Sequence, residues 1–160
     1  MRKYTLPFHE TKGIIPIVEV GMGEGKLFYA IVDTGSESTL IDKRFKKTFP
    51  GVVKSHKVVG KTNYHGISGE VETVLVEAVI QLPMKTVDGE AEPLEMKCFV
   101  NDLSSLSAHY KKIYGFDGEF MMLLGSDVMR QLGAVIDLGK DRLTLKVKEN
   151  RKKKQICLEQ

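Results

Sequence analysis

The sequence has no tryptophan, two cysteines among 160 residues, and no apolar run near the ~20 residues that a membrane-spanning helix needs. Two cysteines are too few for a disulfide framework, so we expect Cys98 as a free thiol in the core and Cys157 as a free thiol in the tail. The basic N-terminus is not followed by the apolar stretch of a secretory signal. These absences favour a cytoplasmic protein without a membrane partner.

The chain also lacks a large excess of charge, because its net charge is only +3. This balance gives no strong argument for a nucleic-acid partner, and the basic run 151–154 is typical of a solvated tail. The histidines lie far apart and show none of the spacings of paired metal ligands. They are His9, His56, His65 and His109. We therefore expect neither a metal nor another cofactor.

Most of the apolar segments have the pattern of β-strands. Ile14–Val20 and Leu27–Val32 flank a glycine-rich joint and predict a hairpin. Residues 52–81 predict a second, longer hairpin with a polar, glycine-rich tip at 60–69. Further strands are expected at 94–100 and 120–124, and a final hairpin from 134–137 and 143–147. The chain is therefore predicted to be mainly β.

Helical patterns are few. Residues 127–132 predict one short C-terminal helix that Ser126 caps and Gly133 ends. Residues 102–120 have apolar side chains at near-helical spacing, which indicates a short helix or an ordered loop. Asp42 is expected to cap one or two helical turns in the basic stretch after it. The chain divides into an N-terminal extension (1–13), a β domain (14–147) and a basic flexible tail (148–160).

One ionisable side chain, Asp33, ends an apolar strand and is followed at once by a turn. A carboxylate beside apolar strand residues costs free energy unless hydrogen bonds or charges compensate. Thr34 and Ser36 supply hydroxyls, and Gly35 allows a tight turn beside the carboxylate. These residues alone leave two interpretations open, a functional carboxylate or an aspartate that caps a turn.

The segment Ile31-Val32-Asp33-Thr34-Gly35-Ser36 resembles the active-site motif of aspartic proteases, and residues 14–147 resemble their retropepsin-like branch. Two further motifs follow in the same order. Gly66-Ile67-Ser68-Gly69 stands where the family has its mobile flap. Leu123-Leu124-Gly125 precedes a predicted helix and the segment 133–137, as in the family. The resemblance implies a closed acid-protease barrel with a flap hairpin and one short C-terminal helix.

Retropepsin-like proteins carry one Asp-Thr-Gly motif per chain and form homodimers. The resemblance therefore implies an aspartic endopeptidase with Asp33, Thr34 and Gly35 as its catalytic segment, in which two copies of Asp33 meet across a two-fold axis. A peptide or protein substrate would lie extended between the active-site strands and the flap. Its implied binding residues are Ser36, Glu37, Gly66, Ile67, Ser68 and Gly69. Ser36 is further expected to donate a hydrogen bond to a catalytic carboxylate.

The chain departs from the family after its third motif. Retroviral members carry an arginine there that braces the active-site turn, whereas Gly125 is followed here by Ser126 and Asp127. That brace is therefore missing or replaced. The connection 102–120 is also longer than in the family.

Two other functions remain open. The first is a retropepsin-like module for dimerisation or peptide binding without turnover, against which the intact motif at Asp33 argues. The second is phosphoryl transfer, because Asp33, Gly35 and Ser38 also fit the phosphate loop of actin-like kinases. Those folds need two lobes and about twice this length, which disfavours the second function.

Overall fold

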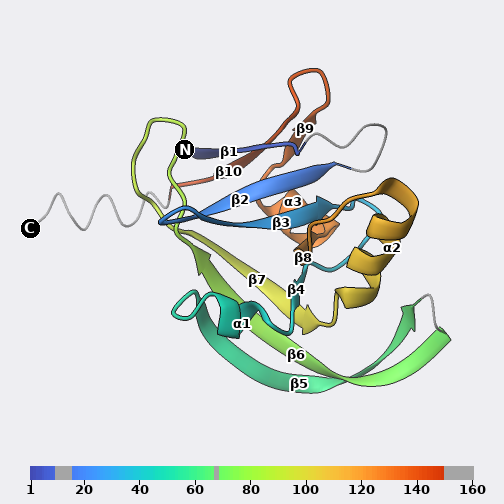
Figure 1. Ribbon diagram of the computed structural model, residues 1–160. Helices are drawn as coiled ribbons and strands as arrows, with labels where there is room; N and C mark the ends of the chain where they lie inside the picture. Colours follow the sequence, from blue (N-terminus) through green and yellow to red (C-terminus); the bar gives the residue numbers. More distant parts are fainter. Residues whose placement is uncertain (10–15, 67–68, 150–160) are drawn as a thin grey trace, which may run out of the picture.

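The computed structural model describes residues 1–9, 16–66 and 69–149, which form a mainly β fold with ten strands and three helices (Figure 1). The strands are β1 (Arg2–Pro7), β2 (Ile17–Gly23), β3 (Lys26–Val32), β4 (Leu40–Asp42), β5 (Val53–Gly66), β6 (Gly69–Leu82), β7 (Leu94–Asn101), β8 (Phe120–Leu124), β9 (Val135–Asp137) and β10 (Arg142–Val147). The helices are α1 (Phe45–Thr48), α2 (Ser104–Tyr114) and α3 (Ser126–Gln131). All three predicted hairpins are confirmed, as β2–β3, β5–β6 and β9–β10.

The described strands form two sheets. The smaller has the order β1-β10-β9, and the larger has the order β2-β3-β8-β4-β7-β6-β5. The larger sheet is antiparallel except where β3 pairs with β8 and β4 pairs with β7. Strands β2 and β5 are its two edges. The closed barrel that the resemblance implies is therefore not confirmed.

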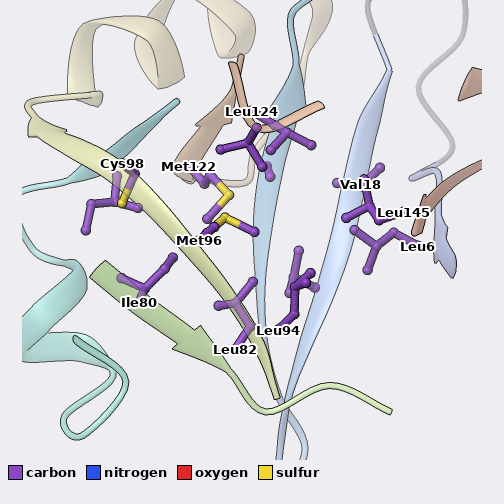
Figure 2. Close-up of a cluster of buried hydrophobic side chains, with 14 of the residues drawn as sticks. Leu6, Val18, Ile80, Leu82, Leu94, Met96, Cys98, Met122, Leu124 and Leu145 are labelled. Atoms are coloured by element: carbon purple, nitrogen blue, oxygen red, sulfur yellow. The ribbon is translucent and has the colours of Figure 1, made fainter. Parts of the chain in front are cut away.

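Buried apolar side chains gather in two clusters on opposite faces of the larger sheet. In β3, Phe28, Ala30 and Val32 belong to the larger cluster, whereas Ile31 belongs to the smaller one, as the alternation of a strand requires. Figure 2 shows the larger cluster filling the space between β2, β3, β6 and β7. Cys98 lies in this cluster as a buried free thiol, as predicted, and its burial raises the pKa of the thiol to about 12.

The N-terminal segment belongs to the folded core. Residues 2–7, which the sequence placed in an extension, form β1 and pair with β10 along the whole strand. Tyr4 and Leu6 are buried in the larger cluster. The predicted tail lies outside the described residues from residue 150 onward, Cys157 included.

The structure confirms two helix predictions and corrects the details of others. The helical spacing in 102–120 is confirmed as α2, which has eleven residues, and the helical turn expected after Asp42 is confirmed as α1. The described residues therefore contain three helices rather than the single C-terminal helix that the resemblance implies. Helix α3 begins at Ser126, one residue earlier than predicted, and Gly125 occupies its N-cap position. The predicted cap by Ser126 is therefore wrong. Gly133, whose φ is +51°, follows the helix as predicted.

Asp42 fastens α2 to β4. Its buried carboxylate accepts hydrogen bonds from the backbone N–H and the Nε of Arg44, at 2.9 and 2.7 Å, and from the N–H of Leu103 at 2.9 Å. The prediction that Asp42 caps α1 is wrong, because Arg44 is the N-cap of α1 and Leu103 is the N-cap of α2. Burial by itself raises the pKa of Asp42. The hydrogen bonds from Arg44 and Leu103 and the charge of Arg44 outweigh this effect and hold the pKa below its usual value.

We expect Asp42→Asn to lower the free energy of unfolding by about 2–4 kcal/mol at pH 7, because Arg44 loses its buried anionic partner. A lowered pKa in the folded state stabilises the fold above the unfolded pKa of about 3.9, and this stabilisation is lost as the pH falls through the folded pKa. The difference between wild type and variant should therefore shrink below about pH 4.

Urea unfolding at pH 7 and at pH 3 measures this difference. Asp88→Asn is the matched control, since Asp88 is exposed in the turn after β6 and should change stability by less than about 0.5 kcal/mol. A difference for Asp42→Asn that is the same at both pH values would contradict the prediction.

Candidate active site

Asp33 follows β3 at the point where the parallel pair β3–β8 ends. Its backbone N–H donates to the carbonyl of Leu124 at 3.0 Å, which extends the pairing of the two strands by one residue. Its side chain is half-buried, and one carboxylate oxygen accepts a hydrogen bond from the N–H of Gly35 at 2.9 Å. Thr34 and Gly35 themselves are exposed. The structure thus places an accessible carboxylate at the end of two buried strands.

Thr39 joins the loop after Asp33 to the start of α3. Its side chain is fully buried, and its hydroxyl donates to Asp127 Oδ1 at 2.7 Å and accepts from the N–H of Gly125 at 2.9 Å. The backbone N–H of Thr39 donates to the second oxygen of Asp127 at 3.1 Å. Asp127 therefore braces this loop through both of its carboxylate oxygens. Sequence reasoning missed Thr39, because its partners are 86 and 88 residues away.

Gly125 is required at the crossing of these two segments. A Cβ atom at this position would lie 2.5 Å from the carbonyl oxygen of Ser38 and 3.0 Å from that of Ser36. Both contacts are with backbone, which cannot rotate away as a side chain can. The next residue, Ser126, donates its N–H to the carbonyl of Ser36 at 2.7 Å. The loop that carries Asp33 is thus held directly against the beginning of α3.

Ser36 does not have the expected contact with the carboxylate. Its hydroxyl donates to the carbonyl of Ser38 at 2.9 Å, so the expected hydrogen bond to a catalytic carboxylate is not present within this chain. The hydroxyl instead stabilises the turn that leads to Thr39. Glu37 is exposed beside it, and a role for either residue in substrate binding stays a prediction.

The expected flap is the end of the long hairpin β5–β6, whose last described pair is Gly66 with Gly69. Gly69 has a φ of +104°, which favours glycine at this turn. Ile67 and Ser68 lie outside the described residues. Figure 1 shows this end of the hairpin on the same side of the molecule as α2 and the end of β3. A flap that closes over Asp33 stays a prediction.

Tyr110 lies outside the motifs, and the charge of Asp33 affects its pKa. It is 5% exposed on α2, and its ring contacts Tyr114 and Phe120 at centroid distances of 5.2 and 5.1 Å. Burial raises the pKa of Tyr110, and the nearby Tyr114 and the charge of Asp33 raise it further. The near-helical spacing of apolar residues in 102–120 was the sequence signal for its burial, but no sequence signal linked it to Asp33.

Across residues 1–9, 16–66 and 69–149, no three histidine, cysteine, aspartate or glutamate side chains gather into a group that could hold a metal ion. The helices of this described part are all too short or too polar to cross a membrane.

We expect Thr39→Val to lower the free energy of unfolding by about 1–3 kcal/mol, because the buried N–H of Gly125 and one oxygen of Asp127 each lose a partner. Thr39→Ser retains the hydroxyl and is the matched control, which should lose clearly less. Urea unfolding of the three proteins provides the measurement. Equal stability of the Val and Ser variants would show that these hydrogen bonds do not hold the loop.

Comparison with known proteins found no matching protein-family model and no similar curated protein. Among solved structures, the retroviral protease-like domain of Ddi1 from Leishmania major is 18% identical, with a TM-score of 0.44, over 84% of this chain and 88% of that one. A retropepsin-like aspartic protease from Rickettsia conorii is 18% identical, with a TM-score of 0.42, over 91% of this chain and 99% of that one. The chain is thus similar to two retropepsin-like domains, which belong to the family that its three motifs resemble.

Proposed function

We propose that this protein is an aspartic endopeptidase that works as a homodimer, with Asp33 of each protomer forming the catalytic pair. A peptide or protein substrate, a cytoplasmic location and an acid-protease fold closed by the flap are parts of the same proposal. The observation that carries it is the placement of Asp33, an accessible carboxylate at the end of two buried strands, on a loop that Asp127 and Thr39 brace.

The chemistry follows from two carboxylates at short distance. At a separation of about 3 Å they cannot both ionise comfortably, so the pair shares one proton, as is established for aspartic proteases. The ionised carboxylate takes a proton from a water molecule, whose oxygen then attacks the carbonyl carbon of the peptide bond. The protonated carboxyl donates its proton to the carbonyl oxygen. The tetrahedral intermediate then breaks as the carboxyl that took the water proton gives it to the leaving nitrogen, while the other carboxylate takes back a proton from a hydroxyl of the intermediate. The amine is released, and the pair again shares one proton.

Features of the single chain support a role for Asp33 in such a pair. The N–H of Gly35 donates to one carboxylate oxygen and orients the side chain. The other residues of the motif leave the carboxylate accessible, since Thr34 and Gly35 are exposed. A side chain at position 35 would come within 3.2 Å of the carboxylate oxygen, so the glycine also keeps the space beside it open.

The alternative is a module of the same fold that dimerises or binds peptides without turnover. It shares every feature of the fold and differs only in the chemistry of Asp33. Catalysis is therefore the property that separates the two functions.

We expect Asp33→Asn to lower the rate of peptide cleavage by at least about 100-fold, because the amide can neither take the proton from water nor share one with its partner. Cleavage of a mixed peptide library, followed by mass spectrometry, measures the rate. Asp88→Asn is the control and should cleave like the wild type. Equal turnover by Asp33→Asn and wild type would reject the endopeptidase, and peptide binding without cleavage by the wild type would support the alternative.

We also expect the activity of each wild-type chain to depend on its partner. When Asp33→Asn chains are mixed and equilibrated in ninefold excess, only about one wild-type chain in ten retains a wild-type partner, and activity per wild-type chain should fall about tenfold. Dilution of the wild type alone should lower its specific activity once the dimer dissociates. A self-sufficient monomer would show neither loss.

A further inference from the structure

The pairing of β3 with β8 shows on which face of the larger sheet Asp33 lies. In β3, Ile31 belongs to the smaller apolar cluster, and its partner in the parallel strand is Leu123, which belongs to the same cluster. The pairing continues to Asp33 through its bond to Leu124. Since side chains two residues apart share a face, Asp33 follows Ile31 on the face of the smaller cluster. Ile31 and Leu123 are therefore the apolar side chains next to the carboxylate on this face.

This face is already covered. Ile31 is 2% exposed and Leu123 is 9% exposed, and both belong to the same buried cluster as Tyr110 of α2 and, more loosely, Leu106. Figure 1 shows α2 on the side of the molecule to which β3 points. A substrate side chain that approaches Asp33 from this face therefore meets a filled apolar cluster rather than an open apolar pocket.

Tyr110 is the residue of α2 whose ring belongs to this cluster. The ring packs against Phe120, which precedes Leu123 on the same face of β8, and the charge of Asp33 raises the pKa of its hydroxyl. The ring of Tyr114 contacts the ring of Tyr110. Tyr114 is 47% exposed, so it lies on the solvent side of Tyr110.

Contacts at both ends and in the middle hold α2 in this place. Asp42 binds the N–H of Leu103 at its start, and Lys43 forms an ion pair with Asp102 at 3.0 Å. The hydroxyl of Ser107 accepts the N–H of Phe120 at 2.9 Å. After the helix, the ring of Phe116 stacks on that of Phe120, with centroids 5.1 Å apart and planes at 15°. These contacts fasten α2 to the end of β4 and to the beginning of β8.

We propose that Tyr110 is a specificity-determining residue, which restricts the substrate side chain next to the scissile bond to a small one. This inference rests on the proposed endopeptidase function. A large apolar side chain would need the space that the Tyr110 ring fills. A smaller residue at 110 would leave an apolar space for it in the cluster that also contains Ile31 and Leu123.

The test compares wild type, Tyr110→Leu and Tyr110→Phe on a peptide library with alanine, leucine or phenylalanine on either side of the scissile bond. Wild type should prefer alanine. Tyr110→Leu should raise kcat/KM for the large side chains relative to alanine by about 10- to 200-fold, the range that one change of pocket size produces. Tyr110→Phe retains the ring and should keep the wild-type preference.

Ile113→Ala is the matched control, because Ile113 lies on the same helix and is 56% exposed. It should leave the preference unchanged. Thermal unfolding shows whether each variant is folded. An unchanged preference in a folded Tyr110→Leu protein overturns the proposal, as does a wild-type preference for large side chains.

Two measurements separate a failure of this inference from a failure of the proposed function. Loss of the negative charge in Asp33→Asn should lower the pKa of Tyr110, seen in the tyrosinate absorbance during alkaline titration and absent in Tyr110→Phe. Asp88→Asn should cause no such change. An unchanged titration overturns the inference whether or not the protein cleaves peptides.

If wild type cleaves no library peptide, the endopeptidase proposal fails. The peptides that each immobilised protein retains are then identified by mass spectrometry. Enrichment of large side chains by Tyr110→Leu over wild type supports the role of Tyr110 in selecting a bound peptide. An unchanged or empty set of retained peptides overturns it.

Discussion

The loop that carries Asp33 crosses the start of α3 at a distance that leaves no room for a side chain at position 125. The position of Asp33 depends on this contact. It lets Ser126 donate to the carbonyl of Ser36, and it brings Asp127 within reach of both donors of Thr39. The parallel pair β3–β8 fixes where the loop begins, and the crossing fixes where it runs next. The strands β3 and β8 and the helix α3 thus determine the position of the Asp33 carboxylate.

A second constraint acts through Asp42, which is the last residue of β4. Its buried carboxylate binds Arg44 in its own segment and the N-terminus of α2, and Arg44 reaches on to Glu119 just before β8. The beginning of α2 and the beginning of β8 are therefore tied to the same strand end. This arrangement explains how the long connection 102–120 becomes an ordered helix that packs on the smaller apolar cluster.

The features that could be predicted from the sequence are the strands and turns, whose signals lie in neighbouring residues. Alternating or continuous apolar residues predicted the strands, and glycines predicted the turns of the hairpins, because these signals act within a few residues. The segment 2–7 was misjudged because only two of its side chains, Tyr4 and Leu6, face the core, and their burial depends on β10 at the other end of the chain. A short strand with few apolar residues gives little signal without its partner.

The polar contacts also depend on residues that are distant in sequence, and the sequence did not predict them. Asp42 stands before a basic stretch and has the local pattern of a helix cap, yet its distant partner is Leu103, 61 residues away. Ser126 likewise has the pattern of a cap, but the structure uses its backbone N–H rather than its hydroxyl. Aspartate and serine are suited to many roles, so their type alone does not choose among them. The motif at Asp33 was recognisable because three constrained residues follow one another, whereas the brace at Thr39 and Asp127 is divided between two segments.

The brace formed by Asp127 also bears on the proposed assembly. Both oxygens of Asp127 and the hydroxyl of Thr39 have their partners within one chain, so the contacts that position the loop need no second copy. In the proposed dimer, association would supply the second carboxylate and its surroundings, and little of the binding free energy would be lost in ordering the loop. In the single chain, the carboxylate of Asp33 is half-buried, with the Gly35 N–H as its hydrogen-bond donor. In the proposed dimer, the proton-sharing pair is therefore created by association, while the geometry of each half is set by the fold of its own chain.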